Sequence, residues 1–239
     1  MENNIQEDNL PKTTLIEKHD IYSGFLKALL FILYFFIMGV PDIPLVFGLN
    51  DYITLAIHIV LFLLLAYFLI IKYRKHLSIY NPNGFGNTKL NGKLVLFMIS
   101  MFFIDFAMHI AINMFQDSVP SNEIQLQNLS LGLPITMLFS IVIVAPIVEE
   151  LIFRGIFFNY FFNKNTLLNN ILAVFFSGLI FGLMHEPRIS LHLLSYSLMG
   201  WIFATIYMYT KDIRYSIFYH GLNNLIASIP LILSIFQSI

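Results

Sequence analysis

Two adjacent carboxylates interrupt one of the most apolar stretches of this chain. Glu149 and Glu150 lie in the segment Ala-Pro-Ile-Val-Glu-Glu-Leu-Ile-Phe-Arg-Gly, with apolar runs on either side. Glu150 and Arg154 are four residues apart, so on a helix they share a face and can form an ion pair. Glu149 points about 100° away on the same helix and has no partner nearby in the chain. The spacing predicts a structural Glu150–Arg154 pair and a free Glu149 carboxylate that faces a cavity.

Two further apolar segments carry polar side chains. His185 ends the run Phe-Gly-Leu-Met-His, while His220 and Asn224 are four residues apart and share a helix face. A single histidine in such a segment is most often a hydrogen-bonded packing residue. A carboxylate, two imidazoles and an amide on three different segments, however, form a plausible hydrolytic set. Glycines that permit close helix approach flank these positions: Gly178, Gly182 and Gly221.

This set suggests two kinds of hydrolytic chemistry. In the first, Glu149 and His185 hold and deprotonate a water that attacks a peptide carbonyl, while His220 and Asn224 donate hydrogen bonds to the oxyanion. In the second, Glu149, His185 and His220 bind a divalent metal such as zinc, with water at the fourth position. The sequence has no H-E-x-x-H motif, so that signature does not support the metal. No cofactor is certain, and both interpretations stay open.

The composition shows what kind of protein must position these residues. Of 239 residues, 58% are hydrophobic and 11% charged, and the mean hydropathy is +0.76. A soluble domain has about 25% charged residues. The 13 basic and 14 acidic residues exclude a nucleic-acid binder, and the lack of cysteine excludes disulfides and cysteine nucleophiles. A polytopic membrane protein remains.

Hydropathy predicts an all-α membrane bundle of about seven transmembrane helices around a central polar cavity. We expect a flexible polar tail over 1–20, a transmembrane domain over 21–239, and the catalytic motifs within 131–230. Pro146 should kink the fourth span, since it removes a backbone hydrogen bond. The predicted spans are roughly 22–41, 52–72, 94–115, 131–161, 167–185, 190–210 and 213–236.

Lysine and arginine in the short loops predict the orientation in the cell membrane. The loops 72–93, 162–167 and 211–214 are basic, whereas 42–51 and 116–130 carry only acidic charges. Basic loops lie on the cytoplasmic side, which predicts a cytoplasmic N-terminus and an outer C-terminus. Arg188, beside Glu186, is the exception.

The three motifs must converge although they lie at different depths in their spans. At 1.5 Å per residue, Glu149 lies ~22 Å from Lys164, whereas His220 lies only ~10 Å past Arg214. We therefore expect tilted or broken helices, or span boundaries that differ from those given above.

The three motifs, in this order on successive apolar segments, resemble the CPBP family. This is the CAAX-protease and bacteriocin-processing family of intramembrane endopeptidases, once called Abi proteins. The motifs that carry the resemblance are Glu149-Glu150-x-x-x-Arg154, Phe181-x-x-x-His185 and His220-x-x-x-Asn224.

The resemblance implies an all-helical membrane fold and proteolysis near the membrane surface. It implies that Glu149 is the catalytic glutamate, His185 the water-activating histidine, and His220 with Asn224 the oxyanion pair. Glu150 and Arg154 complete the first motif. The family is named as metalloproteases, although a metal-free glutamate mechanism has also been argued for it. The partners implied are the lipid bilayer and a membrane-associated peptide or protein: a prenylated protein, a peptide pheromone or a bacteriocin leader.

Two other functional classes are compatible with such a chain. One is a catalytically silent membrane scaffold or bacteriocin-immunity protein, although the four proposed catalytic residues are all present. The other is a proton-coupled transporter with a Glu–Arg–His relay. Transporter folds usually contain duplicated halves, and the sequence shows no duplication.

Overall fold

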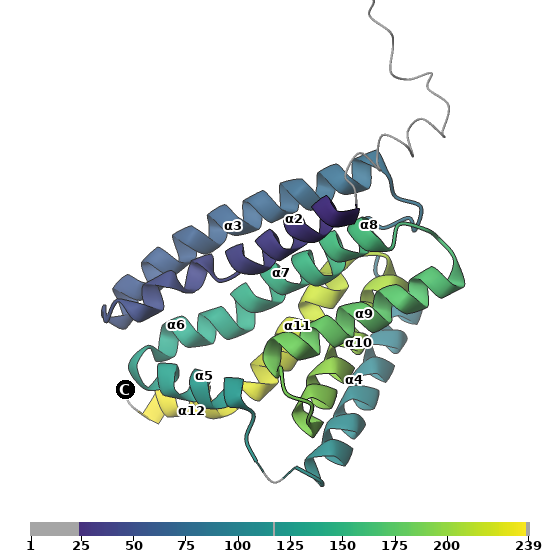
Figure 1. Cartoon of the computed structure of the whole chain (residues 1–239). Helices are drawn as coiled ribbons and strands as arrows, with labels where there is room; N and C mark the ends of the chain where they lie inside the picture. Colours follow the sequence, from purple (N-terminus) through teal and green to yellow (C-terminus); the bar gives the residue numbers. More distant parts are fainter. Residues whose placement is uncertain (1–23, 117, 238–239) are drawn as a thin grey trace, which may run out of the picture.

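The computed structural model describes residues 24–116 and 118–237, and the tail expected over 1–20 lies outside this part of the chain. The described residues form helices and no strand (Figure 1). Within the described residues, six helices are long and apolar enough to cross a membrane, or seven if the bent pair at the C-terminal end counts as one span. The all-α, polytopic architecture predicted from hydropathy is therefore confirmed. The main helices are α2 (Gly24–Ile37), α3 (Asp51–Ile79), α4 (Gly92–Asn113), α5 (Ser121–Gly132), α9 (Leu167–His185), α10 (Leu191–Thr210), α11 (Ile213–Ala227) and α12 (Ile229–Gln237).

The long helices begin where a polar side chain caps the first turn. The side chains of Asn50, Asn91, Thr166 and Ser190 accept hydrogen bonds from backbone N–H groups at the starts of α3, α4, α9 and α10. Asp212 does the same for α11. These residue types are favoured at this position because a helix leaves its first N–H groups without partners.

The fourth span is one continuous helix of mixed type. It contains α6 (Pro134–Phe139), α7 (Ala145–Glu150) and α8 (Phe157–Phe161), joined by the π-helical segments η3 (Ser140–Val144) and η4 (Leu151–Ile156). Pro146 lies just after η3, so the wider turn accommodates the proline for which the sequence predicted a kink. Both π segments flank the two glutamates.

Several predicted spans have different limits in the structure, and α3, predicted to end at 72, runs to Ile79. The fourth span begins at Pro134, not at 131, because α5 is a separate helix that ends at Gly132. The Asp51 carboxylate accepts hydrogen bonds from the N–H groups of Ile135 (2.8 Å) and Thr136 (2.9 Å), which starts a new helix there. The last span is not straight, since α11 and α12 meet at an angle of 51°. Pro230, at the start of α12, lacks the N–H that a continuous helix would need.

The first span changes helix type along its length. The helix α2 ends at Ile37 and a 3₁₀ segment, η2 (Val40–Val46), follows it, so the candidate span runs over Gly24–Val46 and passes the predicted limit of 41. Pro41 and Pro44 lie in this segment and are incompatible with the interior of an α-helix.

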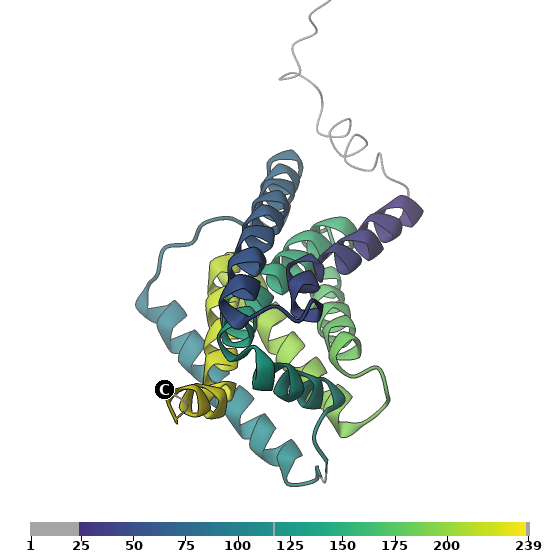
Figure 2. The same ribbon diagram turned by 90° about the vertical axis from the view of Figure 1, so that its left-hand side faces the viewer.

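Three loops meet at one end of the bundle, and Figure 1 shows this end at the upper right. The Gly86 N–H donates to the Lys211 carbonyl (2.7 Å), and the Asn83 amide donates to the Phe162 carbonyl (3.5 Å). These are the loops that the sequence identified as basic. The segment α5 and the helix α12 lie across the opposite end, as the two views show (Figures 1 and 2).

Helices α9 and α10 pack with almost no space between their backbones. A Cβ atom at Gly178 would lie 2.0 Å from the Trp201 ring, and one at Gly182 would lie 2.1 Å from Ser197 Oγ. Only glycine fits at these two positions, as the sequence predicted. This contact fixes the height of His185, the last residue of α9, against α10.

Candidate active site

Glu150 lies at the centre of a buried polar cluster, and both of its carboxylate oxygens accept hydrogen bonds. Its carboxylate accepts hydrogen bonds from Arg154 Nη1 (2.8 Å), Ser216 Oγ (2.5 Å) and His220 Nδ1 (3.1 Å). Glu150 and Arg154 are both 0% exposed. The guanidinium also donates to the Gly200 carbonyl (2.8 Å). The ion pair predicted from the four-residue spacing is present and joins α7, η4, α10 and α11.

Glu149, the preceding residue, has opposite surroundings. It is 9% exposed, and its Oε2 atom has no hydrogen-bond partner in the structure. The nearest basic group is His220, whose Nε2 atom lies 3.9 Å from Oε2. Such a gap is too long for a hydrogen bond but short enough for one bridging water. Glu149 is thus a buried carboxylate with an unused oxygen.

His220 lies between the two glutamates. Its Nδ1 atom contacts Glu150, whose carboxylate is paired with Arg154 and so accepts hydrogen bonds. Nδ1 must therefore carry a hydrogen, and Nε2 faces Glu149. The ring stacks on Phe203, with centroids 4.4 Å apart and planes at 24°. These contacts hold the imidazole in one orientation.

His185 and His220 share an aromatic neighbour, the ring of Phe181. Its Nδ1 atom is 2.9 Å from the Phe181 carbonyl, which can only accept, so Nδ1 carries the hydrogen and Nε2 is left as an acceptor. The Phe181 ring contacts both imidazoles, at 4.4 Å from His185 and 5.8 Å from His220. Among the described residues, no hydrogen bond or ion pair joins His185 to Glu149.

Asn224 bonds to the fourth span where Pro146 leaves a carbonyl unpaired. In η3 the Ala145 N–H donates to the Ser140 carbonyl, which is the π-helical pattern. By that pattern the partner of the Ile141 carbonyl would be residue 146, and proline has no N–H. The Asn224 amide donates to this carbonyl instead (2.8 Å). The amide nitrogen keeps a second hydrogen for another acceptor.

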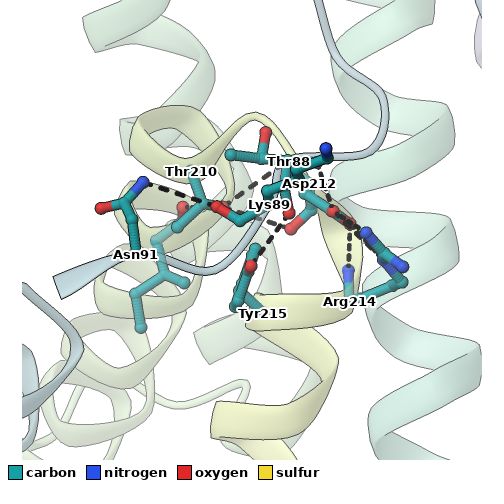
Figure 3. Close-up of polar contacts among 8 residues, drawn as sticks. Thr88, Lys89, Asn91, Thr210, Asp212, Arg214 and Tyr215 are labelled. Atoms are coloured by element: carbon teal, nitrogen blue, oxygen red, sulfur yellow. Dashed lines mark hydrogen bonds and ion pairs between the residues drawn. The ribbon is translucent and has the colours of Figure 1, made fainter. Parts of the chain in front are cut away.

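The motifs converge because α11 is fixed at its first turn. The buried Asp212 carboxylate accepts hydrogen bonds from the N–H groups of Thr88 (2.8 Å) and Arg214 (3.0 Å) and from the Arg214 guanidinium (2.6 Å). The Tyr215 hydroxyl donates to the Thr88 carbonyl (2.9 Å). Figure 3 shows this cluster between the loop before α4 and the start of α11.

Asp212 has a pKa below its ordinary value. Burial alone would raise the pKa of this carboxyl, but the hydrogen bonds from Arg214 and Thr88 stabilise the charged form and outweigh burial. The sequence analysis did not identify Asp212 or Thr88. An aspartate just before an apolar helical run is a recognisable cap signal, whereas Thr88 has no such signal.

The proposed metal ligands do not form a metal site in this structure. Within residues 24–116 and 118–237, no group of three or more His, Asp or Glu side chains is close enough to hold a metal ion. Within the described residues, His185 makes no hydrogen bond or ion pair with the other two proposed ligands. The set of Glu149, His185 and His220 therefore does not fit a zinc ion here, and we derive no step through a metal.

The fold and site together define a polytopic helical membrane protein with a buried cluster of carboxylate, imidazole and amide groups. Residues 131–226 match the family described as type II CAAX prenyl endopeptidase, Rce1-like. This match confirms the resemblance predicted from the motifs, and it includes every motif residue from Glu149 to Asn224.

Two curated proteins are similar to part of the chain. The "Putative membrane peptidase YdiL" of Bacillus subtilis (strain 168) is 43% identical over 82 residues, which is 34% of this chain and 32% of that protein. The "Membrane-embedded CAAX protease MroQ" of Staphylococcus aureus (strain USA300) is 34% identical over 90 residues, or 36% of each chain. The alignments thus span about a third of each relative. No solved structure matches the chain.

Proposed function

We propose that this protein is an intramembrane endopeptidase that hydrolyses a peptide bond of a membrane-associated peptide or protein. The observation that carries the proposal is the buried Glu149 carboxylate, whose Oε2 atom has no hydrogen-bond partner and lies 3.9 Å from His220 Nε2. It lies inside the region that matches the Rce1-like family. A neighbouring carboxylate with three donors has a structural explanation, whereas Glu149 has none, and an intramembrane carboxylate without a partner indicates function.

In the proposed reaction, one water lies between Glu149 Oε2 and His220 Nε2. Glu149 accepts a proton from this water as the water oxygen bonds to the carbonyl carbon of the scissile peptide. His185 Nε2 accepts the second hydrogen of the water and orients it. When the C–N bond breaks, Glu149 returns the proton to the leaving amine.

The carbonyl oxygen becomes negatively charged during the attack. The free hydrogen of the Asn224 amide and Nε2–H of His220 are the proposed donors to this oxyanion. Since Nδ1–H of His220 is bonded to Glu150, donation from Nε2 requires a doubly protonated ring.

The experiment uses the full chain, purified and placed in lipid nanodiscs. It is incubated with a panel of membrane-associated peptides: a prenylated C-terminus, a pheromone precursor and a bacteriocin leader. Cleavage that is detected by mass spectrometry and lost in Glu149→Gln supports the proposal. Equal cleavage by Glu149→Gln would overturn the assigned mechanism, and binding without new termini would indicate a silent scaffold instead.

A parallel incubation with a chelator tests the role of metal. We expect cleavage to continue, because the three proposed ligands are not assembled. Loss of cleavage on chelation, with recovery on adding zinc, would require the metal mechanism.

A further inference from the structure

The imidazole of His185 contacts two aromatic rings from two helices. The Phe181 ring lies one turn earlier on the same helix, with centroids 4.4 Å apart. The Tyr196 ring of α10 stacks on the imidazole at 4.8 Å with planes at 24°. The Phe181 carbonyl fixes Nδ1 but leaves the ring free to swing about that bond. The Tyr196 ring blocks this swing.

Tyr196 is itself held from a third element. Its hydroxyl donates to the Asn122 side-chain carbonyl of α5 at 2.7 Å. Close by, Ser118 Oγ is hydrogen-bonded to His192 Nε2 (3.1 Å), so the segment before α6 is joined to α10 at two points. These bonds fix the ring relative to α5.

The backbones of α9 and α10 pack closely together beside the stacked rings. Ser197, next to Tyr196, lies directly against Gly182, where a Cβ would be 2.1 Å from Ser197 Oγ. The ring therefore stands at a fixed height beside His185. Three independent contacts thus converge on one imidazole: a carbonyl, a stacked ring and the close glycine packing.

We propose that Tyr196 is a positioning residue for His185, and that Asn122 transmits the placement of α5 to this histidine. The Tyr196 ring keeps Nδ1–H of His185 hydrogen-bonded to the Phe181 carbonyl and holds its Nε2 acceptor in one orientation. The catalytic consequence rests on the function proposed above, whereas the control of ring orientation does not.

The first test is kinetic and uses four variants of the full chain in nanodiscs. Tyr196→Leu removes the stack and should lower kcat by about 10- to 100-fold, with little change in KM, because the binding groups are untouched. Tyr196→Phe and Asn122→Ala each remove only the hydrogen bond and should lower kcat by about 3- to 10-fold. The double variant Tyr196→Phe/Asn122→Ala should have the same kcat as either single variant, because both substitutions remove the same hydrogen bond.

Tyr209→Leu is the matched control. Tyr209 also lies on α10 and also stacks on a ring, Phe97, at 4.0 Å, but not on a histidine. It should leave kcat unchanged. An equal loss of kcat in Tyr209→Leu, or additive losses in the double variant, would overturn the proposal.

The second test needs no proteolysis. Nitrogen NMR of the ¹⁵N-histidine-labelled protein reports which ring nitrogen carries the hydrogen, and His185→Gln assigns the signal. We expect a single tautomer, with hydrogen on Nδ1, in the wild type and a mixture in Tyr196→Leu. An unchanged His185 signal in Tyr196→Leu would refute the positioning role. If the wild type cleaves nothing, the proposed function fails while this measurement still decides the positioning role.

Discussion

Glu149 and Glu150 are neighbours in the chain, but only one of them has hydrogen-bond donors around it. Glu150 is neutralised by Arg154 and bonded to α11, whereas Glu149 Oε2 has no partner. Replacing Glu149 with glutamine should therefore leave the fold intact and lower kcat by about 10²- to 10⁴-fold, because only the general base is lost. Turnover and the melting temperature, measured on the same preparation, check both halves of this expectation. Wild-type turnover would remove Glu149 from the chemistry.

Arg154 should behave in the opposite way. Arg154→Ala leaves the Glu150 charge without a partner in the interior, which costs about 3–5 kcal/mol of unfolding free energy. Denaturation in detergent, followed by circular dichroism, measures this loss. Arg74→Ala, at an exposed position of α3, is the control and should have little effect. A fully stable but inactive Arg154→Ala would instead assign the guanidinium to the reaction.

The π segment before Pro146 is joined to the helix α11 by the hydrogen bond from Asn224 to the Ile141 carbonyl. Asn224→Ala leaves the Ile141 carbonyl without a donor, which should cost about 1–3 kcal/mol. Pro146→Ala restores a backbone N–H at the π-helical position, so the double variant should recover stability. Its kcat should stay about 10²- to 10³-fold low, since the oxyanion donor is still missing. Recovery of kcat together with stability would make Asn224 purely structural.

The cap of α11 has a pH dependence of known sign. The pKa of Asp212 is lowered in the fold, so its charged form stabilises the protein above the unfolded value of about 3.9. The stabilisation is lost as the pH falls through the lower folded value. Asp212→Ala should cost about 1 kcal/mol at pH 7. Melting temperatures of both proteins should converge as the pH falls below the unfolded value, and a constant difference would contradict this account.

Helix geometry made part of the site predictable from sequence. The Glu150–Arg154 pair follows from a four-residue spacing, and the glycines at 178 and 182 follow from side-chain size. The roles of Ser216 and Tyr196 could not be predicted in this way. Ser216 bonds to Glu150, which is 66 residues away in the chain, and Tyr196 contacts His185 and Asn122 on two other helices. Tertiary contacts of this kind leave no local pattern.

Hydropathy likewise predicted the existence of the spans better than their shapes. The average polarity of a segment does not register a break within it, so the separate α5 and the bend before α12 were missed. Pro230 determines the bend before α12. The break between α5 and α6 depends on the contact of the Asp51 carboxylate with Ile135, a residue 84 positions away. Pro146 was recognised, but its accommodation in a π segment requires the Asn224 amide from another helix.

The whole molecule has chemically different ends. The loops that carry most of the basic charge meet at one end, joined by the hydrogen bonds of Gly86 and Thr88 to the turn before α11. The segment α5 and the helix α12 lie at the other end (Figure 1). Arg188 is the basic residue out of place, and its charge is paired with Glu186 at 3.0 Å. The same distribution of basic loops is the basis on which the sequence predicts a cytoplasmic N-terminus, and this orientation stays a prediction.

The orientation can be tested directly because the chain contains no cysteine. A single cysteine at an exposed site of each end, Lys164→Cys or Asn128→Cys, gives one reactive thiol per protein. In intact cells, a membrane-impermeant maleimide should label Asn128→Cys and should label Lys164→Cys only after permeabilisation. Both variants should react in detergent, which controls for thiol access. The reverse labelling pattern would place the basic loops outside the cell and would contradict the predicted cytoplasmic N-terminus.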